Sequence, residues 1–369
     1  MKFGIVGPIS KDRVIWPNGE TASKFGAVVY TATVLARLLE GTKDQVICLS
    51  HISPDHFEEI AGLLEHPNIS LAGVAALYKS GTEIDLSYVD EQERISCQTK
   101  VMTPITHGEL HALLDCDSVI FMPLNETDIP LKELQDFRRR SVATIFLDIH
   151  GLITAVDSSG KRFKKHWQDA EAWLACIDIL KMNDKEASWA AGYALTHLED
   201  YLQYSISIVK SGLTACWITF GDQSSLIVWQ RRGRLFWASV PVTQVEQVLD
   251  TIGCGDTASA GFIYAYARLH RPLFGVVMGN MLGSVKASIV ESSDFPSRPE
   301  VRSMIARHYR DYLHNLVDDY LSQSQLIVHE IKEELIHEDS LYSPDGHRYR
   351  HGTDLSRGSH SQGPTAPWS

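Results

Sequence analysis

Two spacings of apolar residues alternate along the chain. Short apolar runs with the length of a buried strand lie at residues 2–7, 45–50, 118–122, 143–148, 177–182 and 215–220. Apolar residues recur at helical spacing over residues 26–39, 54–64, 131–140, 169–176, 183–191 and 195–210. Strands that alternate with helices predict an α/β fold, a doubly wound, mostly parallel sheet with helices on both faces.

The pattern changes over residues 71–101, where polar and apolar residues alternate. The turn-forming pairs Ser80-Gly81 and Asp90-Glu91 interrupt this stretch, so we predict hairpins with one exposed face rather than a buried parallel strand. Together with residues 14–23 they would form a small β-sheet lid that projects from the main body, at about residues 12–24 and 71–104. Two further runs, 226–229 and 235–240, predict antiparallel strands at an edge of the main sheet.

Beyond Asp256 the apolar spacing predicts helix to about residue 336, with an interruption near residues 292–299. Residues 336–369 are rich in Ser, Gly, His, Asp and Pro and lack apolar periodicity, which is typical of a disordered tail. The pattern therefore predicts one large domain over residues 1–335, followed by this tail.

Composition narrows the classes of function. The 369 residues are 44% hydrophobic and 22% charged, as in ordinary globular proteins. The net charge of −12 argues against a nucleic-acid partner. The six cysteines include no CxxC pair, which favours free thiols in a reducing cytosol over disulfides or a zinc site. Because the chain enters a strand directly and has no apolar run of membrane-spanning length, we expect a cytoplasmic protein without a membrane partner.

The strongest chemical signal is the string Asp250-Thr251-Ile252-Gly253-Cys254-Gly255-Asp256. It follows an apolar run and opens a long apolar segment at residues 257–269, so it predicts a turn into a helix. Unpaired N–H groups at a helix start attract an anion, and glycine lets the backbone approach that anion closely. Asp256 beside such an anion would accept a proton, as phosphoryl transfer to a hydroxyl requires. The simpler alternative is a glycine turn whose Asp residues cap a helix, and the full seven-residue string disfavours it.

Other polar positions follow predicted strands, at the edge where open α/β sheets bind ligands. Asn183 and Glu186 would share the first turn of a helix and could hold the water shell of Mg²⁺, although their spacing alone favours a capping box. Thr219 and Gly221 end a strand in a sharp turn that a nucleotide could contact, by itself a weak signal. Asp12 would lie in a loop at the carboxyl end of the first strand.

In this order, the features resemble the ribokinase-like (PfkB-type) carbohydrate kinases over about residues 1–300. The most specific part is residues 250–256, which match the family's D-T-x-G-x-G-D signature. The resemblance implies transfer of the γ-phosphate of ATP to a hydroxyl of a sugar or sugar-like alcohol. It makes Asp256 the catalytic base and the backbone of residues 252–255, including Gly253, Cys254 and Gly255, the anion hole.

The resemblance also implies ligand-binding residues. Asn183 and Glu186 match the N-x-x-E magnesium motif, which reverses the preference for a capping box. On the nucleotide side it places Asp250, Thr251, Thr219, Gly221 and Asn280, the last in a run of small residues for which helix packing is the default interpretation. On the acceptor side it places Asp12, Gly26, Tyr30 and Arg94, although a residue like Arg94 is more often solvated on a strand. The small sheet matches the family's lid, so a homodimer through the lid would fit.

The acceptor side departs from the family pattern. Phe25 stands where the family has the first glycine of a pair, and Tyr30 stands near the place of an asparagine that lines the sugar site. Cys254 replaces a common alanine. Its thiol lies at a helix start that favours thiolate, but the neighbouring carboxylates oppose this, and a small packing side chain is the preferred interpretation. We therefore leave the acceptor unnamed.

Three other interpretations remain open. A nucleoside kinase of the same superfamily would need an aromatic pocket for a base, which Trp16, Phe25 and Tyr30 could supply. A nucleotide-binding regulator without catalysis is disfavoured because both motif carboxylates are present. A dinucleotide-dependent dehydrogenase would need a glycine fingerprint after the first strand, where the chain has only Gly4 and Gly7.

Overall fold

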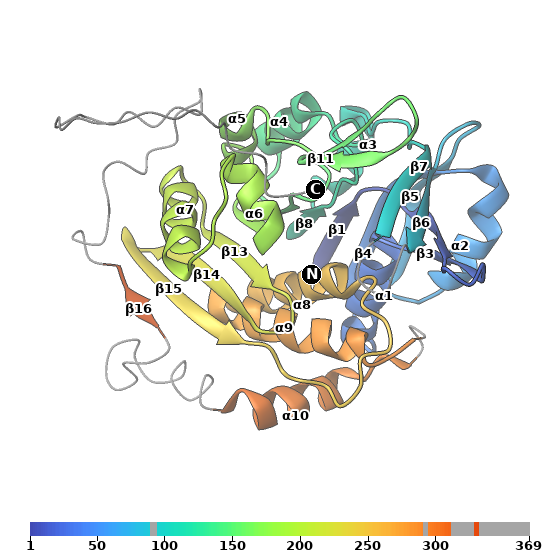
Figure 1. The fold of residues 1–369 in the computed structure, drawn as a ribbon. Helices are drawn as coiled ribbons and strands as arrows, with labels where there is room; N and C mark the ends of the chain where they lie inside the picture. Colours follow the sequence, from blue (N-terminus) through green and yellow to red (C-terminus); the bar gives the residue numbers. More distant parts are fainter. Residues whose placement is uncertain (89–93, 291–293, 311–327, 332–369) are drawn as a thin grey trace, which may run out of the picture.

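A mostly parallel β-sheet runs through the centre of the molecule (Figure 1). The structure, a computed structural model, describes residues 1–88, 94–290, 294–310 and 328–331. In these residues the main sheet has ten strands in the order β16-β15-β14-β13-β12-β9-β8-β1-β4-β5. The parallel strands are β1 (Lys2–Val6), β4 (Gln45–Ile52), β5 (Ile69–Ala76), β8 (Ser118–Phe121), β9 (Thr144–Asp148), β12 (Ile179–Asn183) and β13 (Ala215–Phe220). The strands β14 (Ser224–Arg231), β15 (Arg234–Pro241) and β16 (His329–Glu330) continue one edge in antiparallel pairing.

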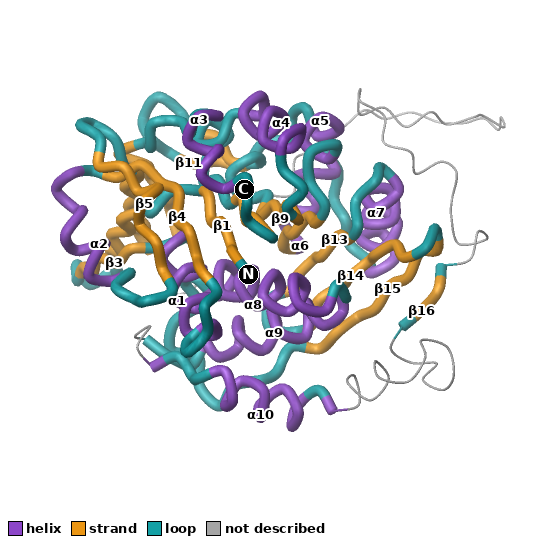
Figure 2. Tube along the Cα trace, turned by 180° about the vertical axis from the view of Figure 1, so that it is seen from behind, coloured by secondary structure: helices purple, strands orange, loops and turns teal. Residues whose placement is uncertain are grey.

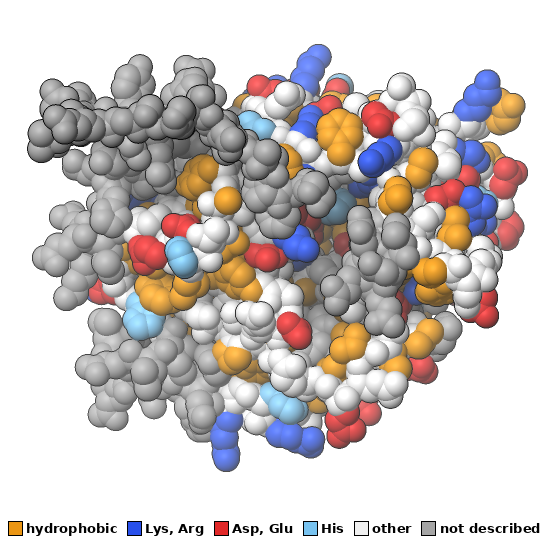
Figure 3. All heavy atoms as spheres, viewed as in Figure 1, with side chains coloured by type: hydrophobic (Ala, Val, Ile, Leu, Met, Phe, Trp, Pro, Cys, Tyr) orange, Lys and Arg blue, Asp and Glu red, His pale blue; other side chains and the backbone are white. Residues whose placement is uncertain are grey.

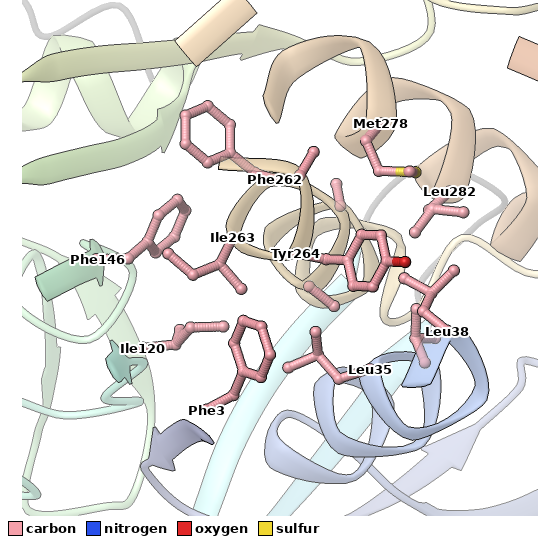
Figure 4. Packing of buried hydrophobic residues seen from close by; sticks show 14 of the residues in the cluster. Phe3, Leu35, Leu38, Ile120, Phe146, Phe262, Ile263, Tyr264, Met278 and Leu282 are labelled. Atoms are coloured by element: carbon pink, nitrogen blue, oxygen red, sulfur yellow. The ribbon is translucent and has the colours of Figure 1, made fainter. Parts of the chain in front are cut away.

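Successive residues of the parallel strands point to opposite faces of the sheet, where two apolar cores form. One core packs Phe3, Ile120 and Phe146 against α1 (Val28–Leu39), α2 (Phe57–Leu63), α8 (Cys254–Leu269), α9 (Pro272–Ala287) and α10 (Arg298–His308) (Figure 4). The other packs Val119 and Phe121 against α3 (His107–Leu110), α4 (Leu131–Arg140), α5 (Ala170–Leu174), α6 (Asp184–Ala191) and α7 (Leu198–Lys210). The predicted doubly wound α/β fold is confirmed.

A second, four-stranded sheet has the order β3-β2-β6-β7, with β2 (Ser10–Ile15), β3 (Thr21–Phe25), β6 (Thr82–Tyr88) and β7 (Arg94–Lys100). It is the predicted lid, and its β2 and β6 pair in parallel. Two expectations about it were wrong. Residues 71–76 belong to β5 of the main sheet, because an edge strand with one exposed face shows the same alternation as a hairpin strand. Asp12 lies within strand β2 rather than in a loop.

A hairpin that the sequence did not predict, β10 (Thr154–Val156) and β11 (Arg162–Lys164), packs on the lid. Its turn meets β7, where the N–H of Gln98 donates to the carbonyl of Gly160 at 2.7 Å. Cys97 and Lys161 form an isolated antiparallel β-bridge there. The lid and this hairpin therefore lie side by side, with β11 next to β7 in Figure 1 and β11 seen from behind in Figure 2.

The last described residues correct the prediction of continuous helix to residue 336. Residues 329 and 330 form β16, which is held to β15 by an Arg234–Glu330 ion pair and by stacking of the Trp237 and His329 rings at 4.4 Å. Ile331 is buried beside it. Residues 311–327 and the expected tail lie outside the described residues.

Surface and chemical features agree with the composition. All six cysteines are free. No helix in the described part of the chain is long and apolar enough to cross a membrane. On the face drawn in Figure 3, Lys and Arg side chains are interspersed with Asp and Glu side chains.

Candidate active site

A cavity of about 760 Å³ lies at the carboxyl ends of the parallel strands, under the lid and the hairpin. Strands, mostly at their ends, contribute Met122, Asp148, Lys181, Asn183 and Thr219 to its wall. Of the residues predicted for the site, those that line it are Asp12, Tyr30, Asn183, Glu186, Thr219, Thr251, Gly253, Gly255 and Asp256. Segments that are far apart in the sequence thus converge where ligands bind in open α/β sheets.

The signature string forms the predicted turn into a helix. Gly253 is the N-cap of α8 with φ of 82°, and a Cβ at this position would lie 2.5 Å from Cδ2 of Tyr30. Both the positive φ and the ring contact therefore require glycine. α8 begins at Cys254, whose N–H donates to the carbonyl of Thr251 at 3.4 Å, while the following amides of the first turn have no preceding helical turn to donate to and are oriented for an anion.

Asp256 lies in that first turn, on the wall of the cavity. Burial is the main cause that raises the pKa of its carboxyl to about 7, and the nearby charge of Asp148 raises it further. The ammonium of Lys181 opposes both effects. A carboxyl that titrates near neutral pH is well matched to accept a proton from an alcohol and release it again.

Sequence reasoning missed the ion pair beside Asp256. Nζ of Lys181, in the middle of β12, lies 2.5 Å from Oδ2 of Asp148, at the end of β9, and donates to the carbonyl of Gly255 at 3.0 Å. Both side chains are less than 10% exposed. The signal was a lysine inside the apolar run of residues 177–182, because a buried strand rarely carries a charge without a partner.

Asn183 and Glu186 form the capping box and also line the cavity. Oδ1 of Asn183 accepts the N–H of Glu186 at 2.8 Å, and Oε2 of Glu186 accepts the N–H of Asn183 at 2.9 Å. Oε1 of Glu186 lies 2.9 Å from Nδ1 of His150. Burial opposes ionisation of Glu186, but the hydrogen bond and charge of His150 and the charge of Lys164 outweigh it and lower its pKa below the usual value.

This donor set fits a hydrated magnesium ion. Glu186 stays ionised, and the Asn183 amide faces the same cavity, which suits a cation that keeps several of its waters. Because their hydrogen bonds already fix both side chains, the residues would meet water molecules of the ion without rearranging.

The other residues expected near the nucleotide divide into two groups. Thr219 and Thr251 line the cavity, whereas Gly221 lies beyond its wall with φ of 57°. Asn280 is buried, with Oδ1 accepting from Oγ of Ser225 at 2.7 Å and Nδ2 donating to the carbonyls of Val240 and Pro241. These bonds tie α9 to β14 and β15, so the structure gives Asn280 the packing role.

On the acceptor side, Asp12 and Ser10 of β2 face the cavity together with Ile84 and Leu86 of β6. Gly26 lies against them, since a Cβ there would be 2.9 Å from Oδ2 of Asp12. Arg94 begins β7, but its side chain is outside the described part of the chain.

The aromatic residues that favoured a nucleoside acceptor do not gather here. Tyr30 lines the cavity, but Phe25 is buried against the ring of His56. Trp16 follows β2 and is 39% exposed, outside the cavity wall. One of the three expected aromatic residues therefore lines the cavity, where Tyr88 and Phe163 join it.

Neither Asp250 nor Cys254 is in the cavity wall. The Asp250 carboxylate is bound by two lysines, and the Cys254 thiol donates to the Asp250 carbonyl at 3.7 Å. Burial and the charges of Asp250 and Asp256 raise the pKa of Cys254 to about 11 despite Lys286. The thiol is therefore protonated at neutral pH, which supports the packing interpretation over a reactive thiolate.

The comparisons with known proteins agree with the motif. The model of the pfkB family carbohydrate kinases matches residues 152–289. No curated protein matches the sequence. Solved structures of kinases are also similar to this chain. A pyrophosphate-dependent kinase in the ribokinase family has a TM-score of 0.65 at 20% identity, over 82% of this chain and 99% of that one. Ribokinase from Arabidopsis thaliana, complexed with ribose and ATP, has 0.65 at 16%, over 82% and 98%.

A nucleoside kinase from Burkholderia thailandensis, in complex with inosine, has a TM-score of 0.61 at 15% identity, over 84% of this chain and 98% of that one. At these identities the structures establish the fold, and the family match adds the segment that contains the signature string. The resemblance to the ribokinase-like, PfkB-type carbohydrate kinases is therefore confirmed, by the family match over residues 152–289 and by the ribokinase fold of the described chain.

Proposed function

We propose that the chain is a kinase that transfers the γ-phosphate of ATP to a hydroxyl of a sugar or sugar-like alcohol. The position of Asp256 carries the proposal: it stands on the cavity wall in the first turn of α8, with a pKa of about 7. The anion-oriented amides of the same turn place a negative group directly beside it. A base and an anion hole on one helix turn suit phosphoryl transfer.

The residues divide the reaction between them. Asp12 holds the acceptor hydroxyl, and Asp256 takes its proton as the oxygen attacks the γ-phosphorus. The bond from that phosphorus to the oxygen of the β-phosphate breaks, and ADP leaves. The amides of Gly253 and Gly255 stabilise the phosphoryl oxygens, since those of Ile252 and Cys254 already donate to Asp250 and Thr251. Lys181 offsets the charge of Asp148 and Asp256. Mg²⁺ near Asn183 and Glu186, when bound, supplies positive charge for the phosphate chain. The lid and the hairpin exclude water from the reacting atoms.

An assay of acceptors and donors tests this proposal. Sugars, inositols and nucleosides are incubated with MgATP or with pyrophosphate, and phosphorylated acceptor is detected by mass. Pyrophosphate is included because one of the similar structures is a pyrophosphate-dependent kinase. We expect acceptor-dependent product from a sugar or polyol with MgATP. Absence of product with every pair, or product from nucleosides alone, would overturn the proposal.

We also propose an oligomeric state and a cellular location for the protein. A homodimer through the lid is supported by two exposed apolar side chains. Ile95 of β7 is 47% exposed, and Trp16, which directly follows β2, is 39% exposed. A cytoplasmic location is supported by six free thiols. Sedimentation of the protein and of a Trp16→Lys variant would test the dimer.

A further inference from the structure

The carboxylate of Asp250 joins three parts of the protein. Its Oδ2 accepts from Nζ of Lys24 in β3 at 2.7 Å and from Nζ of Lys286 in α9 at 3.1 Å. Its Oδ1 accepts the N–H of Ile252 at 2.9 Å. We propose that Asp250 is a junction that positions the anion loop, residues 251–255, and couples this loop to the lid. In this junction Lys286 is a fixed internal cation and Lys24 is the contact from the lid.

Lys286 has the burial expected of a fixed cation. Its side chain is 4% exposed, and its ammonium lies 5.4 Å from the centre of the Tyr30 ring as well as against Asp250. The carbonyl of the next residue, Ala287, accepts the N–H groups of Leu249 at 2.7 Å and of Asp250 at 3.3 Å. The end of α9 therefore holds both the side chain and the backbone that lead into the loop.

The Tyr30 ring holds the same loop at the next residue, Gly253. It lies so close to Gly253 that a Cβ there would be 2.5 Å from Cδ2. The loop thus has two contacts that fix its place, the ring at Gly253 and the carboxylate at Ile252. A loop held at two successive residues keeps its amides in position before a ligand arrives, which reduces the ordering cost of binding.

Lys24 connects this loop to the acceptor side. It is directly opposite Asp12 in the pairing of β2 with β3, so the two side chains lie on one face of the lid. Asp12 is the residue we place on the acceptor hydroxyl. A shift of the lid that accompanies acceptor binding would therefore move Lys24 and, through Asp250, the anion loop. By linkage, an anion at the loop would favour the same lid position.

The charge of Asp250 makes the inference testable without turnover. Removing a negative charge near an anion site should tighten anion binding if Asp250 acts only through its field. If it positions the loop, Asp250→Asn should weaken that binding. We expect weakening of about 10- to 100-fold, the usual effect of losing a residue that orients a binding group.

Isothermal titration with pyrophosphate and with the magnesium complex of a non-hydrolysable ATP analogue would compare wild type, Asp250→Asn, Lys24→Met and Lys286→Met. Hydrogen exchange of residues 251–256 is measured on the same proteins. The matched control is Lys100→Met, since Lys100 pairs with Glu83 inside the lid and does not reach the loop. We expect faster hydrogen exchange of residues 251–256 in Asp250→Asn, Lys24→Met and Lys286→Met, and exchange at the wild-type rate in Lys100→Met. In a further variant, Lys286→Ala, added methylammonium should restore anion binding.

The outcomes separate this inference from the proposed function on which it rests. Unchanged or tighter anion binding in Asp250→Asn would overturn the proposal that Asp250 positions the loop. Hydrogen exchange of residues 251–256 in Lys24→Met that equals exchange in the Lys100→Met control would overturn the coupling to the lid. If wild type binds neither anion, the proposed function fails, and exchange of residues 251–256 still decides whether the two lysines hold the loop. Lys24 is 31% exposed, so its variant keeps the test valid if Lys286→Met does not fold.

Discussion

Asp256 has to be ionised to accept a proton, and its surroundings oppose ionisation. Burial, Asp148 and Asp12 all raise its pKa, and Lys181 limits the increase to about 7. Replacing Asp256 with Asn keeps the size of the side chain and removes the base. We expect the rate of phosphoryl transfer to fall by about 10²–10⁴-fold while ATP binding stays near wild type. Turnover within a few-fold of wild type would show that another group is the base.

The neighbours of Asp256 should move its titration in opposite directions. Because the base must be ionised, kcat/KM should rise with pH through about 7. Lys181→Met removes the charge that lowers the pKa of Asp256, so the rise of kcat/KM, the ascending limb of the pH profile, should move to higher pH. Asp148→Asn removes a charge that raises the pKa, so the limb should move to lower pH, each by about one unit. Profiles that shift together, or not at all, would contradict these assignments.

The raised pKa of Asp256 also has a consequence for stability. The native state holds this proton more tightly than the unfolded chain, in which an Asp carboxyl titrates near about 4. Between about pH 4 and pH 7 the native state binds more protons than the unfolded chain. The contribution of Asp256 to the free energy of unfolding should therefore decrease as pH rises. An activity optimum on the alkaline side of the stability optimum is the expected result.

The positions of single residues were predictable from the sequence where a local string carried the information. Gly253 lies at the predicted turn into a helix and Asp256 in the first turn of that helix, because both positions follow from neighbouring residues. The Lys181–Asp148 pair and the lysines on Asp250 join strands and helices that are far apart in sequence. Such pairs depend on which strands become neighbours, and apolar spacing does not specify that order.

At the scale of elements, the first turn of α6 combines a structural and a chemical role. Glu186→Gln keeps an oxygen for the N–H of Asn183 and removes the negative charge. We expect a higher Mg²⁺ concentration for half-maximal rate and a melting temperature close to wild type. The measurement is initial rate against Mg²⁺ together with thermal unfolding. Unchanged magnesium dependence with a lower melting temperature would leave only the capping role.

Strands were predicted well where both of their faces are buried. Strands β1, β8, β9, β12 and β13 are covered on both faces and appeared as apolar runs. Strand β5 is at the edge and mostly half-buried, so its pattern matched that of the lid. The hairpin of β10 and β11 has three-residue strands with little buried surface, too short for a period of two to be distinguished from a loop.

At the scale of the molecule, the sheet has two different ends. One end is β5, and at the other end the chain returns after α10 to add β16 beside β15. An edge strand exposes unpaired backbone groups, so β16 covers an edge that β15 would otherwise present to solvent. The family match ends at residue 289, before this strand. We expect the stability of the described fold to depend on residues 328–331 and not on the residues after 336.

Two truncations test this division. A chain that ends at Ile336 should keep the activity and melting temperature of the full protein, because residues 337–369 offer little apolar surface to bury. A chain that ends at Leu326 also loses the buried Ile331, the Arg234–Glu330 ion pair and the ring stacked on Trp237. Burial of one large aliphatic side chain contributes about 2 kcal/mol, so its melting temperature should fall by about 2–4 °C. Loss of stability in the longer chain, or none in the shorter one, would show that the division is wrong.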